Sequence, residues 1–222
     1  MSRETELAKN TFIFTVGKIC TQFISFFLLP LYTSFLSPDK FGIVDLFNTY
    51  VTLLLPIVNW SFDLGLFRFM LEVRGNCSKL KSLVSTVINT NIVQCVGYIV
   101  LFWFVHSFIH SEYKFFLLLN VILNVFTSTF LQMARGFGDN IGYTCASLIS
   151  VILNISVNIF TIVILRMGEW GLFIGTIIAQ IVTLIFLIIK EKIWRYYKFL
   201  YWKKCEFFDV FQYSLPLIFG YG

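Results

Sequence analysis

Lys18 is the residue of this sequence whose chemistry most needs an explanation, because it is a cation inside the apolar stretch TFIFTVGKICTQFIS, residues 11–25. A charged side chain at the centre of a membrane helix costs roughly 2.5–3.5 kcal/mol on insertion scales, and such residues tend to face an interior pathway. Lys18 lies eight residues beyond Asn10, about 12 Å along a helix. We therefore predict that Lys18 forms part of a polar cavity wall and pairs with an anionic group of a substrate. Snorkelling of its stem toward the interface is the alternative.

Other polar residues repeat at helical spacing within the apolar stretches of the chain. Steps of three and four residues put them on one face of each helix. The stripes are Thr11, Thr15, Lys18, Gln22 and Ser25; Asp45, Thr49, Thr52, Pro56, Asn59 and Asp63; Ser82, Ser85 and Asn89; Asn120, Asn124 and Thr127; and Ser147, Ser150, Asn154, Asn158 and Thr161.

Lipid offers these groups no hydrogen bond, so each stripe must face the protein or water. One destination is helix packing, where such bonds contribute about 0.6 kcal/mol each. The other is a water-accessible cavity that several helices share. Asp45 and Asp63, near opposite ends of their helix, also fit interfacial charges. The residues taken from the stripes as cavity candidates are Lys18, Gln22, Asn59, Asp63, Asn89, Asn124, Asn154 and Asn158.

The composition places these helices in a membrane. The chain is 58% hydrophobic and 13% charged, against about 25% charged for a soluble domain. Runs of roughly 20 apolar residues are long enough to span a bilayer as helices. We predict an all-α polytopic membrane protein, a six-helix bundle over residues 1–189, with spans near 11–36, 41–62, 82–107, 114–133, 141–166 and 170–189.

The distribution of lysine and arginine predicts the orientation of the bundle. Positive residues are retained on the cytoplasmic side of a membrane. With the N-terminus inside, the cytoplasmic segments hold thirteen of the 17 cations, the opposite side holds Lys40, Lys114 and Arg166, and Lys18 alone lies within a span. The sequence therefore predicts a multi-pass protein of a cytoplasmic membrane with a cytoplasmic N-terminus.

Two segments follow the sixth span. Residues 190–209, KEKIWRYYKFLYWKKCEFFD, are basic and aromatic, a composition that predicts a cytoplasmic interfacial segment against anionic lipid. Residues 210–222, VFQYSLPLIFGYG, open a further apolar run of about 20 Å as helix, too short to span. We read it as the start of a seventh helix and expect the chain to be the N-terminal part of a longer protein.

Convergent catalytic groups are scarce in this sequence. His106 and His110 are four residues apart beside Glu112, at the end of a span, where an interfacial role is simpler than a metal site. The glycines of ARGFGDNIG do not form a dinucleotide loop, and the five cysteines have no C-x-x-C spacing. GLFIG, residues 171–175, fits close helix packing. We predict no catalytic residue, metal, cofactor or nucleic-acid partner.

Three stretches resemble the polysaccharide-biosynthesis flippases, the oligosaccharide-translocating branch of the superfamily that also holds the multidrug extruders. These are LLPLYTSFLSPDKFGIVDL with the later DLGLFRF, LQMARGFGDNIGY, and YSLPLIFG. The resemblance implies two six-helix bundles around a central cavity, of which this chain supplies the first, and alternating access between them.

The resemblance also implies a function, a substrate and partners. A bacterial or archaeal flippase would export a polyprenyl-pyrophosphate-linked oligosaccharide, an O-antigen, capsule or exopolysaccharide unit, while the polyprenyl tail stays in lipid. Lys18 and Arg68, which follows DLGLF, are the cations placed to attract the pyrophosphate. The expected partners are membrane lipid, the C-terminal half of the transporter, and the polysaccharide polymerase and glycosyltransferases of the same pathway.

Three alternatives stay open at this point. A cation-coupled multidrug exporter of the same superfamily would favour acidic residues deep in the first bundle. A membrane enzyme of envelope synthesis would need a large outer loop or a convergent His/Asp/Arg set. An inactive half-length remnant would keep the fold without the transport.

Overall fold

The computed structural model describes residues 30, 32–108, 111–199, 201–218 and 220, and this part of the chain is helical, with no strand. The elements are α2 Pro38–Asn59, α3 Phe62–Glu72, α4 Cys77–Val105, α5 Lys114–Phe137, α6 Asn140–Ile159 with the π-helical turn η1 Phe160–Ile164, α7 Glu169–Glu191, the 3-10 turn η2 Ile193–Arg195, and α8 Lys204–Ile218.

Five helices of the described part are long and apolar enough to cross a bilayer. They are α2, α4, α5, α6 with η1, and α7. Each coincides with one predicted span, from the second to the sixth, and the all-α membrane fold is therefore confirmed. The first predicted span, 11–36, lies almost wholly outside the described residues, so the count of six stays a prediction.

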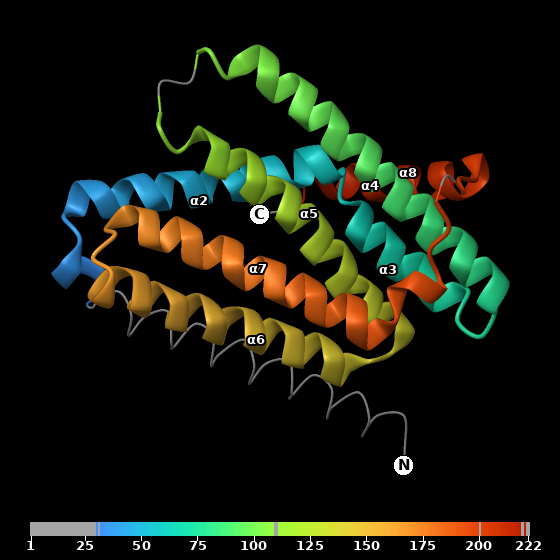
Figure 1. Ribbon diagram of the computed structural model, residues 1–222. Helices are drawn as coiled ribbons and strands as arrows, with labels where there is room; N and C mark the ends of the chain where they lie inside the picture. Colours follow the sequence, from blue (N-terminus) through green and yellow to red (C-terminus); the bar gives the residue numbers. More distant parts are fainter. Residues whose placement is uncertain (1–29, 31, 109–110, 200, 219, 221–222) are drawn as a thin grey trace.

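Most of the turns between helices lie at one of two opposite ends of the bundle, whereas the passage from α2 to α3 lies between them (Figure 1). At one end, which we call the basic end, residues 73–76, 138–139, 192–199 and 201–203 meet. Asp139 Oδ2 lies 2.9 Å from Lys190 Nζ, and the rings of Phe137 and Tyr196 are 4.8 Å apart.

At the opposite end of the bundle, the Glu169 carboxylate accepts from Lys40 Nζ at 2.9 Å and from the Tyr113 hydroxyl at 2.8 Å. Burial and the neighbouring Glu169 carboxylate raise the pKa of Tyr113 to about 12, so its hydroxyl keeps the proton it donates.

Two apolar clusters hold the helices together between these ends. The cluster nearer the basic end includes Phe62, Leu66, Met70, Val84, Met133 and Leu187. The other joins α2, α5 and α7 through Phe47, Val121 and Phe173. The side chains of both clusters are buried, and they pack the helices into one bundle.

The segment predicted as the second span is broken. Trp60 and Ser61, between α2 and α3, have φ of 52° and 53°, the left-handed region that costs a non-glycine residue of order 1–3 kcal/mol. The carbonyl of Asn59, freed by the break, accepts from Gln94 Nε2 at 3.3 Å, and the carbonyl of Ser61 accepts from Leu64 N at 3.1 Å to start α3. Pro56, by contrast, lies inside α2.

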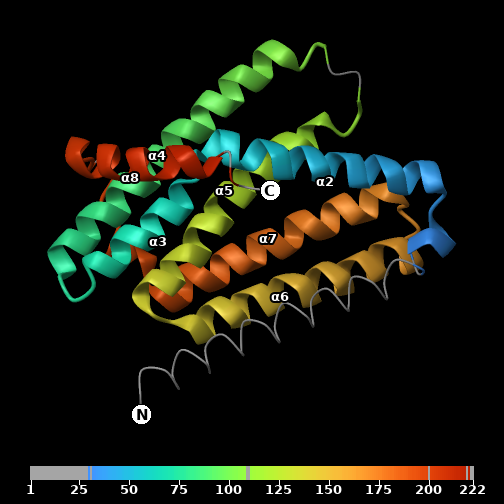
Figure 2. The ribbon, with the colours of Figure 1, turned by 180° about the vertical axis from the view of Figure 1, so that it is seen from behind.

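Helices α6 and α7 run side by side in both views (Figures 1 and 2). The GLFIG motif lies at their contact, because a Cβ at Gly171 would fall 2.7 Å from Thr161 Oγ1 and one at Gly175 would fall on Asn158 Oδ1. The prediction that this motif packs helices closely is confirmed.

Two boundaries differ from the predicted ones. α4 begins at Cys77, five residues before the predicted span, because Asn76 Oδ1 caps it by accepting from Lys79 N at 3.1 Å. α8 begins at Lys204, within the segment predicted as interfacial. The carboxylate of Glu206, in its first turn, accepts from Ser82 and Thr86 of α4, which fixes the start of the helix against the bundle.

Candidate functional site

A pocket of about 310 Å³ lies between α2, α6 and α7, and we call it the polar pocket. Its polar lining comes from three helices and from Tyr32, the residue six positions before α2. The lining residues with polar side chains are Tyr32, Asp45, Asn48, Asn154, Asn158 and Thr176.

Asn158 organises one wall of this pocket. Its Nδ2 donates to Asn154 Oδ1 at 2.6 Å and to the hydroxyl oxygen of Tyr32 at 3.1 Å. Asn154 and Asn158 are one turn apart on α6, so their side chains meet because the stripe repeats every four residues. The side chain of Asn158 is held from the other side by Gly175 of α7. The two predicted site residues of α6 therefore lie together in the pocket.

The pocket presents acceptors and hydroxyls rather than cations. The only charged side chain among its described lining residues is that of Asp45, an exposed carboxylate. Asn158 Oδ1 is buried against Gly175 of α7 and has no hydrogen-bond partner in the described part of the chain, so the lining groups most open to a ligand are the exposed Asn48 amide and Asp45 carboxylate. Amides and a carboxylate of this kind match a neutral ligand with several hydroxyl groups.

Asn124 is half-buried on α5, one turn from Asn120, which faces α7. Its Nδ2 donates to Asn120 Oδ1 at 2.8 Å, and Gln180 Nε2 donates to the same oxygen at 2.9 Å. Asn120 and Gln180 are both buried, with 4% and 8% of their surface exposed. This stripe therefore joins two helices by hydrogen bonds.

Asn59 and Asp63 lie at the break between α2 and α3. Asn59 Nδ2 donates to Asp63 Oδ1 at 3.1 Å, and the two residues are 1% and 3% exposed. The ion pairs found among the described residues do not include Asp63. Asp63 is thus a buried carboxylate whose observed partners are neutral, where the sequence had favoured an interfacial charge.

Arg68 lies one turn farther along α3 and is half exposed. Its Nη1 is 2.7 Å from Glu72 Oε1, an i, i+4 ion pair on the surface of the helix. Lys18 and Gln22 lie outside the described residues, so their cavity roles stay predictions.

Asn89 belongs to a different arrangement, in which the α4 stripe binds the linker, residues 192–199 and 201–203. Asn89 Nδ2 donates to the carbonyl of Tyr201 at 2.8 Å, and Asn89 Oδ1 accepts from the Tyr197 hydroxyl at 3.0 Å. Ser85 Oγ accepts from Lys198 N at 3.0 Å. The stripe predicted from Ser82, Ser85 and Asn89 is therefore satisfied by main-chain and side-chain groups more than 100 residues away.

Comparison with known proteins places this chain in a family. The model of a family described as polysaccharide biosynthesis protein matches residues 7–221. The chain belongs to the polysaccharide biosynthesis protein family.

This chain is similar to an uncharacterized membrane protein of Haemophilus influenzae, with 24% identity over 225 residues. The match covers 97% of this chain and 53% of the relative, so the chain spans about half the length of the relative that it matches. No solved structure matches the chain.

The sequence did not lead us to several residues of the polar pocket and of the buried hydrogen bonds between helices. Tyr32, Asn48 and Thr176 line the polar pocket but were not among the predicted stripes, although Thr176, Gln180 and Thr183 repeat at steps of four and three residues. Gln94 and Gln180 make buried interhelical hydrogen bonds, to Asn59 and Asn120 respectively. A glutamine inside a predicted span is itself a signal, because an amide in lipid needs a partner, and that signal was available at both positions.

Proposed function

We propose that this member of the polysaccharide biosynthesis family is part of a transporter that moves a lipid-linked oligosaccharide across a bacterial or archaeal cytoplasmic membrane. The observation that carries the proposal is the polar pocket, which offers amides, hydroxyls and one carboxylate between three apolar helices. Such a lining suits the hydroxyl groups of a sugar, and alternating access would expose it to each side in turn.

The substrate we propose is a polyprenyl-pyrophosphate-linked oligosaccharide, whose phosphates need cations. The polar pocket supplies none from its described lining residues. Lys18 and Arg68 are the proposed phosphate contacts, and Arg68 would exchange its ion pair with Glu72 for the ligand. We further propose that a second helical bundle completes the cavity, with the pathway's polymerase and glycosyltransferases as functional partners.

The experiment is complementation with the full open reading frame in a strain that lacks its own flippase. Asn154→Leu, which removes an amide from the polar pocket, should reduce surface polysaccharide at normal protein level. The matched control is Ser156→Leu, an exposed position two residues farther along the same helix and outside the lining. Equal polysaccharide in the two variants would reject the polar pocket as a substrate site. No restoration by the unaltered gene would reject the flippase function.

Asp63 favours a second candidate function, a cation-coupled exporter. A cation-coupled transporter needs an acidic group inside the bundle, and Asp63 is 3% exposed beside the end of a broken helix. Freed carbonyls at such helix ends coordinate coupling ions in other transporters. The test is transport of drug and of oligosaccharide by Asp63→Asn under imposed proton and sodium gradients, with the exposed Asp39→Asn as control. Drug export that requires both the gradient and Asp63 would favour the exporter.

A further inference from the structure

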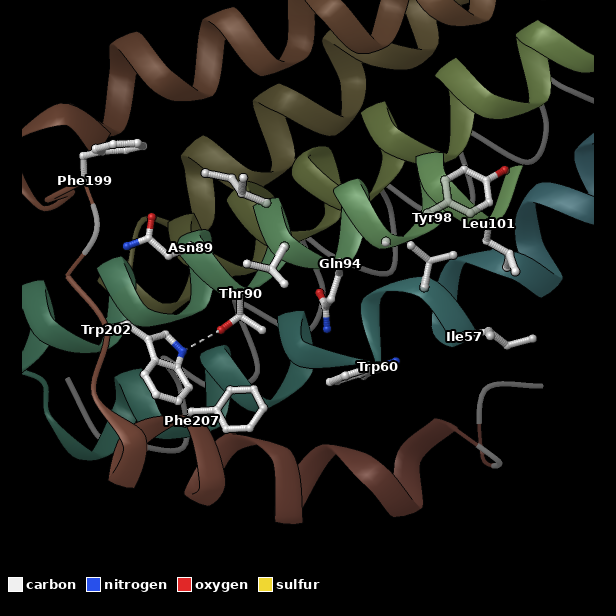
Figure 3. A pocket seen from close by; sticks show the side chains of 14 residues that line it. Ile57, Trp60, Asn89, Thr90, Gln94, Tyr98, Leu101, Phe199, Trp202 and Phe207 are labelled. Atoms are coloured by element: carbon white, nitrogen blue, oxygen red, sulfur yellow. Dashed lines mark hydrogen bonds between the residues drawn. The ribbon is translucent and has the colours of Figure 1, made fainter. Parts of the chain in front are cut away.

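A second and larger cavity lies on the other side of α2, and we call it the apolar groove. It has a volume of about 820 Å³ and lies between the end of α2, α4, the linker and α8 (Figure 3). Its lining is mostly apolar and includes Ile57, Val93, Gly97, Leu101, Phe199 and Phe207. From Asn89 to Leu101 it follows α4 for twelve residues, about 18 Å. The groove is therefore long and suited to an extended hydrocarbon chain.

The linker closes one end of the groove with aromatic side chains. Trp202 Nε1 donates to Thr90 Oγ1 at 3.3 Å, as Figure 3 shows, and the Trp202 ring lies 5.2 Å from that of Phe207. Because Asn89 holds the linker main chain at Tyr201, this wall has a fixed position.

Positive charge is concentrated at that same end. The sequence from Lys192 to Lys204 carries five cations and no acidic residue. Lys198 and Lys203 adjoin the groove residues Phe199 and Trp202. Lys203 is half exposed and lies 3.6 Å from Glu206; hydrogen bonding with Tyr201 and the charge of Glu206 raise its pKa. The aromatic end of the groove is thus an interfacial site that attracts anions.

We propose that the apolar groove binds an anionic phospholipid of the bilayer, with one acyl chain along α4 and the phosphate at Lys198 and Lys203. An apolar groove left unfilled would lose the van der Waals contacts of its lining atoms, and acyl chains are the material that surrounds it in a membrane. The basic linker selects the headgroup. The bound lipid would join the linker and α8 to α4, and this assignment is independent of the function proposed above.

Gly97 gives a direct test of the chain site. A Cβ at Gly97 would have no atom within 4 Å, so phenylalanine there enters the groove without a backbone clash. Gly42 of α2 is equally open but does not line the groove, and Gly42→Phe is the matched control. The readout is native mass spectrometry of the purified chain titrated with phosphatidylglycerol or phosphatidylcholine.

We expect the unaltered protein and Gly42→Phe to retain phosphatidylglycerol. We expect Gly97→Phe to bind it at least about tenfold more weakly. The double variant Lys198→Gln, Lys203→Gln, which changes only exposed side chains, should lose the preference for phosphatidylglycerol over phosphatidylcholine, and it tests the headgroup even if Gly97→Phe does not fold. Unchanged binding by folded Gly97→Phe, or an unchanged preference in the lysine variant, would overturn the proposal. Displacement of phosphatidylglycerol by equimolar polyprenyl phosphate would also overturn it, and would assign the groove to a substrate tail.

Discussion

Replacing Gly175 with alanine should destabilise the contact between α6 and α7 and disturb the polar pocket together. The new Cβ would fall on Asn158 Oδ1 and lie 2.9 Å from Asn158 Cγ. The Asn158 side chain cannot stay in place, and it would give up its bonds to Asn154 and Tyr32. We expect a loss of about 1–3 kcal/mol from overpacking and about 0.6 kcal/mol for the bond from Asn158 to Tyr32, which joins α6 to another segment.

Gly42→Ala supplies the reference for this measurement. Both substitutions gain about 1 kcal/mol of helix propensity, and the Cβ at Gly42 meets no atom. The difference between the two variants in free energy of unfolding should therefore be about 2–4 kcal/mol. It can be measured by equilibrium unfolding in mixed micelles of dodecyl maltoside and dodecyl sulfate.

A double-mutant cycle identifies the cause of the loss. Asn158→Ala removes the atom that the new Cβ would strike, so Gly175→Ala added to Asn158→Ala should cost little more than Asn158→Ala alone. Gly175→Ala as stable as Gly42→Ala, or a full additional loss on the Asn158→Ala background, would refute the packing that we describe.

Two further predictions concern the basic end. Burial alone would raise the pKa of Asp139, but hydrogen bonds from Lys190 and from the Gly142 amide leave it lowered, so its stabilising effect is fully present above about pH 4, the usual pKa of the group, and is lost as the pH falls through the lowered pKa. Asp139→Asn, which keeps the cap on α6, should cost up to about 1 kcal/mol at pH 7 and clearly less near pH 3, as thermal unfolding at the two pH values would show; an equal cost at both would contradict the ion pair. Asn89→Leu removes its three bonds to the linker, each about 1 kcal/mol, and should make tryptic cleavage after Lys198 at least roughly tenfold faster than in the control Thr52→Leu. Equal cleavage in the two would show that Asn89 does not hold the linker.

The spanning helices could be predicted from the sequence because length and hydropathy are sufficient to specify them. A run of some 20 apolar residues has few ways to satisfy its backbone other than as a helix, and α5 and α7 begin within one residue of their predicted starts. The break at Trp60 and Ser61 could not be predicted in this way. Neither residue is a glycine or proline, and the polar steps of three and four residues continue unchanged through the break from Asn59 to Asp63.

The polar stripes show why the site was harder to predict than the fold. Spacing fixes which residues share a face of one helix, but it does not say what that face meets. Asn154 and Asn158 line the polar pocket, Asn124 bonds within the bundle, and Asn89 binds the linker. These three outcomes follow from the same residue type at the same spacing, and only the packing of other helices distinguishes them.

The bonds between α4 and the linker also bear on the order of events during synthesis. The groups that satisfy Ser85, Thr86 and Asn89 lie 109–120 residues later in the chain, and a ribosome adding about 5–20 residues per second needs roughly 5–20 s to supply them. Throughout that interval α4 lacks these partners, although Ser85 can donate to the Lys81 carbonyl of its own helix. Either the insertion machinery or α5, the next helix to emerge, must shelter the polar face of α4 from lipid. A chain released before the linker is made would carry polar side chains on α4 without their partners, a defect that quality-control proteases can recognise.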